Sequence, residues 1–115
     1  MTLYTIKSAI KYVVEKLIKN EISGLVEEDF ETIGQKATFE DLTDNVEQAI
    51  SDFGIFTMPP DVEFDNALVV KQDDGVYRVR MRLWQDNQES DYDLTMLIKE
   101  NDGEPRFNIR GIIMS

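Results

Sequence analysis

The amino-acid sequence predicts an α+β domain of two layers, in which two N-terminal helices pack on an antiparallel sheet of about four strands. Apolar residues recur at helical spacing before residue 54, whereas beyond residue 62 they alternate with polar ones, as in half-buried strands. Pro59-Pro60 separates the two patterns, because a proline pair favours extended backbone. Neither layer can bury its apolar face alone. We therefore expect one domain over residues 1–115, with a helical part at about 1–54 and a sheet part at about 62–115.

The first helix is predicted from about Leu3 to Asn20. Its apolar residues recur at three- and four-residue steps, at Ile6, Ile10, Val13, Val14, Leu17 and Ile18. Lysines on the other side suit either a core-packed helix with a solvated face or a helix lying on a membrane surface. We favour the core-packed helix, because the acidic segment that follows would repel anionic lipid.

The pattern is less regular between residues 21 and 36, where Gly24 and Gly34 bracket a predicted helical turn or short helix. Four acidic side chains in this stretch could hold calcium or could form a solvated acidic turn: Glu27, Glu28, Asp29 and Glu31. The solvated turn is favoured, because the alternating ligands and central glycine of a calcium-binding loop are missing. No metal site is predicted.

The second helix is predicted to begin after Thr38 and to end at Gly54. Thr38 with Asp41 three residues later is a variant of the capping box, and glycine commonly ends a helix. One face is apolar, with Phe39, Leu42, Val46, Ala49, Ile50 and Phe53. The opposite face is acidic, with Glu40, Asp44 and Glu47 in line and Asp41 and Asp52 beside them. Neighbouring acids repel, so this acidic stripe is either tolerated or used for binding.

Four strands are then expected, at about Ala67–Gln72, Tyr77–Trp84, Tyr92–Ile98 and Phe107–Ile113. Tight turns are predicted at Asp73-Asp74-Gly75 and Asn101–Pro105, and Gln85–Ser90 is predicted to be a polar loop. The alternation of side chains gives a predicted core shared by both layers. Its members are Ile10, Leu17, Leu42, Val46, Ile50, Val79, Met81, Leu94, Met96 and Ile109.

The polar face of the predicted sheet carries a row of arginines, Arg78, Arg80 and Arg82. Pairing of the hairpin that buries its apolar residues places Asp93 near Arg82 and Asp91 near Trp84. The last strand extends the same surface with Arg106, Asn108 and Arg110. This face is either a pocket for an anion or partner, or a cross-strand salt-bridge ladder, which we favour. Trp84 is either packed under a loop or a binding anchor.

The composition excludes several kinds of chemistry. The chain has no cysteine and no histidine, which removes thiolate nucleophiles, Ser-His and Cys-His pairs and zinc-thiolate sites. Asp91 and Asp93 could form a paired acid–base site, but the neighbouring arginines favour two ionised carboxylates. We therefore expect neither an enzyme nor a cofactor. Without a signal peptide or a long apolar run, the chain is expected to be cytoplasmic.

The net charge of −11 is concentrated in the middle of the chain. Residues 1–20 carry +3, residues 21–65 carry −12 and residues 66–115 carry −2. Such a field repels nucleic acid and membranes and steers a basic protein toward the acidic segment. Surplus acid also simply keeps small proteins soluble, so charge alone does not prove a partner.

Short motifs within Thr38–Met114 resemble a family of small bacterial proteins. Asp52-Phe53-Gly54 followed by Met58-Pro59-Pro60 is similar to that family's junction between helix and sheet. Leu83-Trp84, a polar loop and then Ser90-Asp91-Tyr92-Asp93-Leu94-Thr95 are similar to its clearest mark. Members of such families include antitoxin-like immunity proteins encoded beside contact-dependent growth-inhibition toxins. The resemblance implies a toxin-binding role without catalytic residues.

Two functions remain open from the sequence. The first is an immunity protein that binds and neutralises a cognate toxin domain, with a basic nuclease (an RNase) as the favoured partner, by placing acids in its basic groove. Its predicted partner-binding residues are Glu27, Glu28, Asp29, Glu31, Glu40, Asp41, Asp44, Glu47, Trp84, Asp91 and Asp93. The alternative is a small-ligand-binding domain with a pocket between the helices and a curved sheet. The residues that could line such a pocket, or could equally form an ordinary core, are Tyr77, Met81, Trp84, Tyr92 and Phe107.

Overall fold

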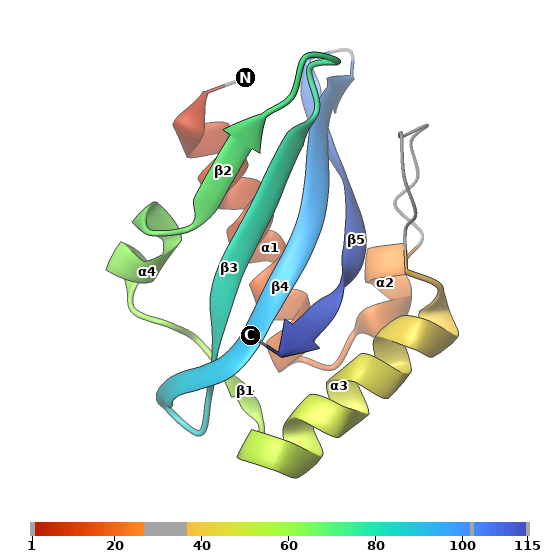
Figure 1. The fold of residues 1–115 in the computed structure, drawn as a ribbon, viewed down its shortest axis with the longest axis vertical. Helices are drawn as coiled ribbons and strands as arrows, with labels where there is room; N and C mark the ends of the chain where they lie inside the picture. Colours follow the sequence, from red (N-terminus) through yellow and green to blue (C-terminus); the bar gives the residue numbers. More distant parts are fainter. Residues whose placement is uncertain (1, 27–36, 102, 115) are drawn as a thin grey trace.

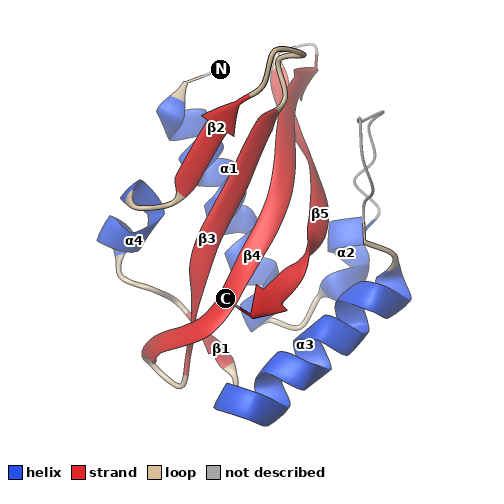
Figure 2. Ribbon diagram, in the orientation of Figure 1, coloured by secondary structure: helices blue, strands red, loops and turns tan. Residues whose placement is uncertain are grey.

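The computed structural model describes residues 2–26, 37–101 and 103–114, and it has the predicted α+β architecture, with helices on one side of an antiparallel sheet (Figure 1 and Figure 2). The helices are α1 (Leu3–Ile18), α2 (Ile22–Val26), α3 (Phe39–Phe53) and α4 (Asp61–Asp65). The strands are β1 (Phe56–Thr57), β2 (Leu68–Lys71), β3 (Tyr77–Gln85), β4 (Gln88–Asn101) and β5 (Glu104–Met114).

The sheet is an open antiparallel one in which β3, β4 and β5 form a meander. β1 and β2 both pair with β3, each along a different part of its outer edge. β3 and β4 place Arg82 opposite Asp93, which is the predicted register. Figure 1 shows α1 behind β3 and β4, with α3 beside the end of β5. One face of the sheet is thus packed on helices.

The two long helices begin where their sequences predict. The Thr38 side chain accepts a hydrogen bond from the Asp41 amide at 3.1 Å, which caps the first turn of α3. Thr2 caps α1 in the same way through the amide of Thr5. Gly54 ends α3 with φ 95° and ψ −169°, a conformation that essentially only glycine adopts. Short polar side chains and one glycine therefore define these helix ends.

The core lies between the helices and the sheet, and all of the predicted core residues except Ile50 are buried in it. Ile50 remains 36% exposed, so its assignment to the core was wrong. Leu42, Val46 and Ala49 fill the side of α3 that meets the sheet. The apolar stripe of α3 is wider than the surface that the sheet can cover, which leaves its margins exposed.

Two short elements were not predicted, and one predicted loop is absent. β1 and α4 flank Pro59-Pro60, where the sequence suggested only an extended link. The predicted polar loop at Gln85–Ser90 is instead a two-residue hairpin turn at Asp86 and Asn87, which have φ values of 50° and 63°. Two positive φ values are the signature of a type I′ turn, which Asp and Asn tolerate.

The lysines of α1 have structural partners. Lys7 forms an ion pair with Asp65 at 2.9 Å and Lys11 with Asp61 at 3.5 Å, so both bind α4. Lys16 pairs with Glu21 at 2.7 Å, and this contact raises the pKa of Lys16 and lowers that of Glu21. The opposite face of α1 is buried in the core. The helix is therefore the core-packed one that the sequence favoured.

Candidate functional site

The acids of α3 are exposed and have no basic neighbours on their helix, which carries five carboxylates and no lysine or arginine. Glu40 and Asp41 lie in the first turn, where negative charge is favoured by the helix dipole. Asp44 and Glu47 lie beyond that turn and gain little from it. Within the described ranges, none of these four carboxylates forms an ion pair.

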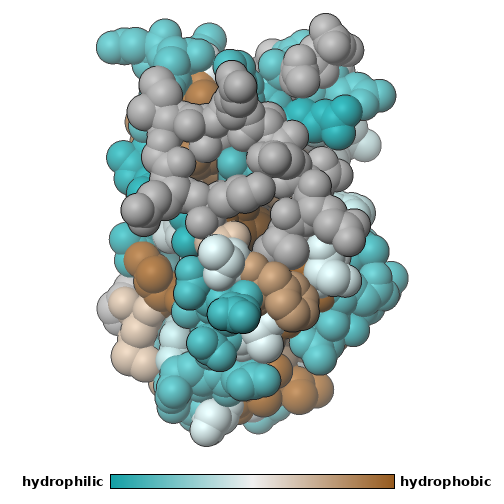
Figure 3. All heavy atoms as spheres, turned by 90° about the vertical axis from the view of Figure 1, so that its right-hand side faces the viewer, coloured by the Kyte–Doolittle hydropathy of each residue, from teal (hydrophilic) through white to brown (hydrophobic). Residues whose placement is uncertain are grey.

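An apolar groove borders this acidic side, between α2 and α3. It encloses about 270 Å³, and its lining residues include Ile22, Phe39, Val46, Glu47 and Ile50. Phe39 is 49% exposed although it belongs to the apolar stripe. Figure 3 views the molecule from this side and shows hydrophobic and hydrophilic side chains next to one another below the grey atoms. We call Phe39, Asp44, Glu47 and Ile50 the α3 surface.

The face of the sheet that points away from the helices is not covered by any described element. Here the carboxylate of Asp93 is buried between two arginines. Arg80 Nε donates to Asp93 Oδ2 at 2.7 Å, and Arg82 Nε donates to Asp93 Oδ1 at 2.8 Å. Arg82 Nη1 also donates to the carbonyl of Ser90 at 2.7 Å. Asp93 therefore holds two of the three arginines in place, as the salt-bridge interpretation expected.

Trp84 and Asp91 lie near one end of this face. A register shift between Arg82 and Trp84 places Glu89, rather than the expected Asp91, opposite Trp84. Asp91 is exposed and lies 3.7 Å from Arg82 Nη1. Trp84 is half-buried, and its Nε1 is buried without a hydrogen-bond partner in the described part of the chain.

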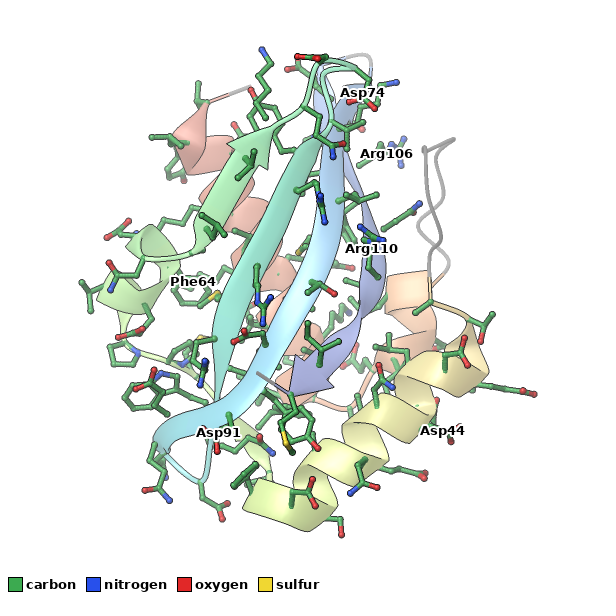
Figure 4. All side chains as sticks on the ribbon, viewed as in Figure 1. Asp44, Phe64, Asp74, Asp91, Arg106 and Arg110 are labelled. Carbon is green, nitrogen blue, oxygen red and sulfur yellow. The ribbon has the colours of Figure 1, made fainter. Side chains whose placement is uncertain are left out.

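The predicted binding residues fall into separate places. Glu40, Asp41, Asp44 and Glu47 share α3, whereas Trp84, Asp91 and Asp93 belong to the sheet. Figure 4 shows Asp44 on α3 and Asp91 on the opposite side of the view. The remaining predictions, Glu27, Glu28, Asp29 and Glu31, lie outside the described residues.

A hollow lies on the open face of the sheet rather than between the layers. Met81, Tyr92 and Phe107, which were considered for a pocket between helices and sheet, are buried in the core. The hollow encloses about 550 Å³ and is lined by Leu68, Val70, Arg78, Val79, Arg80, Thr95, Met96, Arg110 and Ile113. Its apolar members were not predicted from the sequence. Gly111 inside a strand was the available signal, because such glycines often mark bulges near binding sites.

The described residues hold no group of three or more metal-ligating side chains, and none of their helices is long and apolar enough to cross a membrane. The geometry is that of a two-layer α+β domain with an acidic helix on one side and an arginine-bearing sheet face on another. Residues 22–114 match the family described as a domain of unknown function, DUF7668, and the chain belongs to that family. Comparison with curated proteins and with solved structures gave no match.

Proposed function

We propose that this protein is an immunity-type inhibitor that acts in the cytoplasm and binds a basic toxin domain through the α3 surface. The observation that carries the proposal is that one helix combines acids that pair with no described basic residue and exposed apolar side chains. Asp44 and Glu47 make no ion pair with a described residue, and Phe39 and Ile50 remain partly exposed beside them.

Asp44 and Glu47 do not stabilise their helix. Glu40 and Asp41 stabilise the start of α3 through its dipole, but Asp44 and Glu47 lie beyond the first turn. Glu40 and Asp44 are four residues apart, and like charges at that spacing destabilise a helix by a few tenths of a kcal/mol. A basic partner would turn this repulsion into attraction.

The expected mode of inhibition combines steering with short-range anchoring. Opposite fields speed the encounter of the two proteins, and acids can occupy the basic groove where a nuclease binds phosphates. Screening at physiological salt limits the reach of the acidic field to about 8 Å, so exposed charges speed the encounter more than they slow dissociation. Phe39 and Ile50 supply the apolar contact that slows dissociation.

The proposal is tested with two double variants of equal net charge. Asp44→Lys/Glu47→Lys changes the α3 surface, and Asp73→Lys/Glu104→Lys changes exposed acids at the turns of the sheet. If the coding sequence immediately upstream encodes a basic toxin domain, as the proposal expects, each variant is co-expressed with it. Cell survival is then measured together with the affinity of the purified pair at two salt concentrations. The α3 variant should fail to protect the cells and should lose affinity about a hundredfold, whereas the turn variant should protect.

Three outcomes would contradict the proposal. Equal protection by both double variants would show that the α3 surface is not the interface. Loss of protection in Arg78→Ser/Arg110→Ser alone would move the interface to the sheet, because neither arginine pairs with a described residue. If the neighbouring coding sequence encodes no basic toxin domain, the proposed immunity role is wrong.

A further inference from the structure

We propose that the hollow on the open face of the sheet binds a small organic phosphate. The arginine hollow, as we name it, has basic members Arg78, Arg80 and Arg110 and apolar members Leu68, Val70 and Ile113. The phosphoryl group would bind the guanidinium groups, and an apolar substituent would contact the aliphatic side chains. This site is separate from the α3 surface and does not depend on the immunity role.

A β-bulge builds one side of the arginine hollow. Thr95 of β4 pairs with Gly111 of β5, while the next residue, Met96, pairs with Ile109. Arg110 is therefore an extra residue without a partner on β4. Bulges redirect side chains and are common next to functional sites. Here the extra residue turns toward the hollow and shares it with Arg78 and Arg80 of β3.

The bulge is held from both faces of the sheet. On the helix side, the Asn45 side chain of α3 accepts a hydrogen bond from the amide of Ile112 at 3.0 Å. On the open side, the Thr95 hydroxyl donates to the carbonyl of Gly111 at 2.9 Å. A Cβ on Gly111 would lie 3.3 Å from Asn45 Oδ1, so glycine permits this close approach. Two side chains thus fix the backbone that carries Arg110.

The arginine hollow has charge that the described residues do not neutralise. Arg78 and Arg110 form no hydrogen bond or ion pair in the part of the chain that the structure describes, whereas Arg80 uses its Nε to bind Asp93. Three guanidinium groups and one carboxylate leave a local charge of about +2, which matches a phosphomonoester dianion. The chain as a whole carries −11. An anion would therefore need direct contact with these arginines, because the long-range field repels it.

The apolar members favour an organic phosphate over a free ion. Leu68, Val70 and Ile113 are 61%, 49% and 42% exposed, although strands usually turn such side chains inward. They lie around the same hollow as the arginines. A volume of about 550 Å³ is within the range of small-molecule sites. The arrangement therefore offers an apolar group a place beside the charged one.

The test is a calorimetric titration with phenyl phosphate at low salt. We expect saturable binding to the wild-type protein and affinity about tenfold lower in Arg78→Gln and in Arg110→Gln. Inorganic phosphate and benzoate should both bind more weakly, because the first lacks the apolar group and the second lacks the second charge. The matched control is Arg106→Gln, on the same strand but outside the hollow, which should bind phenyl phosphate as the wild type does. Figure 4 shows Arg106 and Arg110 along β5.

Amide chemical shifts supply a second measurement that does not depend on the variants. Phenyl phosphate should move the signals of Thr95 and Gly111, which flank the bulge, and should leave those of α3 residues Asp44 and Glu47 unmoved. No saturable binding to the wild type would overturn the proposal. An equal loss in Arg106→Gln, benzoate binding as tight as phenyl phosphate, or shifts confined to the helices would overturn it as well.

Discussion

At the scale of single residues, the contact between Tyr92 and Asp52 joins the sheet to α3. The Tyr92 hydroxyl donates to Asp52 Oδ2 at 2.5 Å, and Gln48 donates to the other oxygen of that carboxylate at 3.0 Å. The ring of Phe53 meets the Tyr92 ring edge-on, at 5.8 Å between centroids. The hydrogen bond to Asp52, then burial and the nearby charge, raise the pKa of Tyr92 from 10.0 to about 12.

This pKa makes the stability depend on pH in a defined window. Because the folded protein holds the proton more tightly than the unfolded chain, the contribution of Tyr92 is complete below about pH 10 and is lost as the pH rises toward 12. Asp52→Asn should bring the pKa of Tyr92 back toward 10. Absorbance at alkaline pH follows the titration of the tyrosines, and urea unfolding at the same pH values gives the free energy of unfolding. Identical titration curves for both proteins would show that Asp52 does not control this tyrosine.

At the scale of elements, the end of α3 is joined to the β3–β4 hairpin. The Gln85 side chain is buried, and its Nε2 donates to the carbonyls of Ala49 at 2.7 Å and Gly54 at 2.8 Å. These bonds join Gln85 of β3 to the last turn of α3 and to the glycine that ends it. The Ser90 hydroxyl donates to the carbonyl of Leu83 at 2.9 Å on the same hairpin. Gly54, Leu83 and Ser90, which belong to the motifs that suggested a family resemblance, thus make structural contacts at this junction.

Gly54 is the residue at this junction that should tolerate least change. Gly54→Ala should lower the free energy of unfolding by about 1–3 kcal/mol, because its backbone conformation suits only glycine. A Cβ there would also overlap the Asp86 carboxylate. Gly24→Ala is the control, since α2 is helical there and nothing lies within 4 Å of the added carbon. Gly24→Ala should raise the free energy of unfolding, measured with urea, by about 0.5–1 kcal/mol. An unchanged free energy of unfolding in Gly54→Ala would contradict the backbone conformation that ends α3.

At the scale of the whole molecule, charge is divided between the layers. The acids of α3 face solvent on the helical side, and the arginines of β3 and β5 face solvent on the open side of the sheet. The core between them holds the two layers together, and Val46 of α3 is 2% exposed within it. A protein with two differently charged faces can bind two chemically different partners without competition between them.

Val46→Asp should unfold the domain, because an unpaired buried charge costs several kcal/mol and small domains are stable by only about 5–15 kcal/mol. Glu47→Gln, at the next position, changes an exposed side chain. It should leave the free energy of unfolding within about 0.5 kcal/mol of the wild-type value. Circular dichroism melting distinguishes the two. A cooperative melt of Val46→Asp at the wild-type temperature would show that α3 packs through another face.

The sequence by itself determined the fold class and most of the core, because helical and strand periodicities are local properties. It also determined the ends of α3, through Thr38 and Gly54, and the pairing of Arg82 with Asp93. Each follows from residues close in the chain or from the alternation of side chains between the two faces of a strand. The acids of α3 could be predicted to be exposed for the same reason.

Only the tertiary structure decided which apolar residues stay exposed and which charges stay unpaired. The exposure of Ile50 depends on how much of α3 the sheet covers, and the position of Arg110 depends on a bulge held by Asn45 from a distant helix. Asp93 forms ion pairs with two arginines, whereas Arg78 on the same face has no partner in the described ranges. These outcomes depend on contacts between segments far apart in the chain, and periodicity carries no information about such contacts.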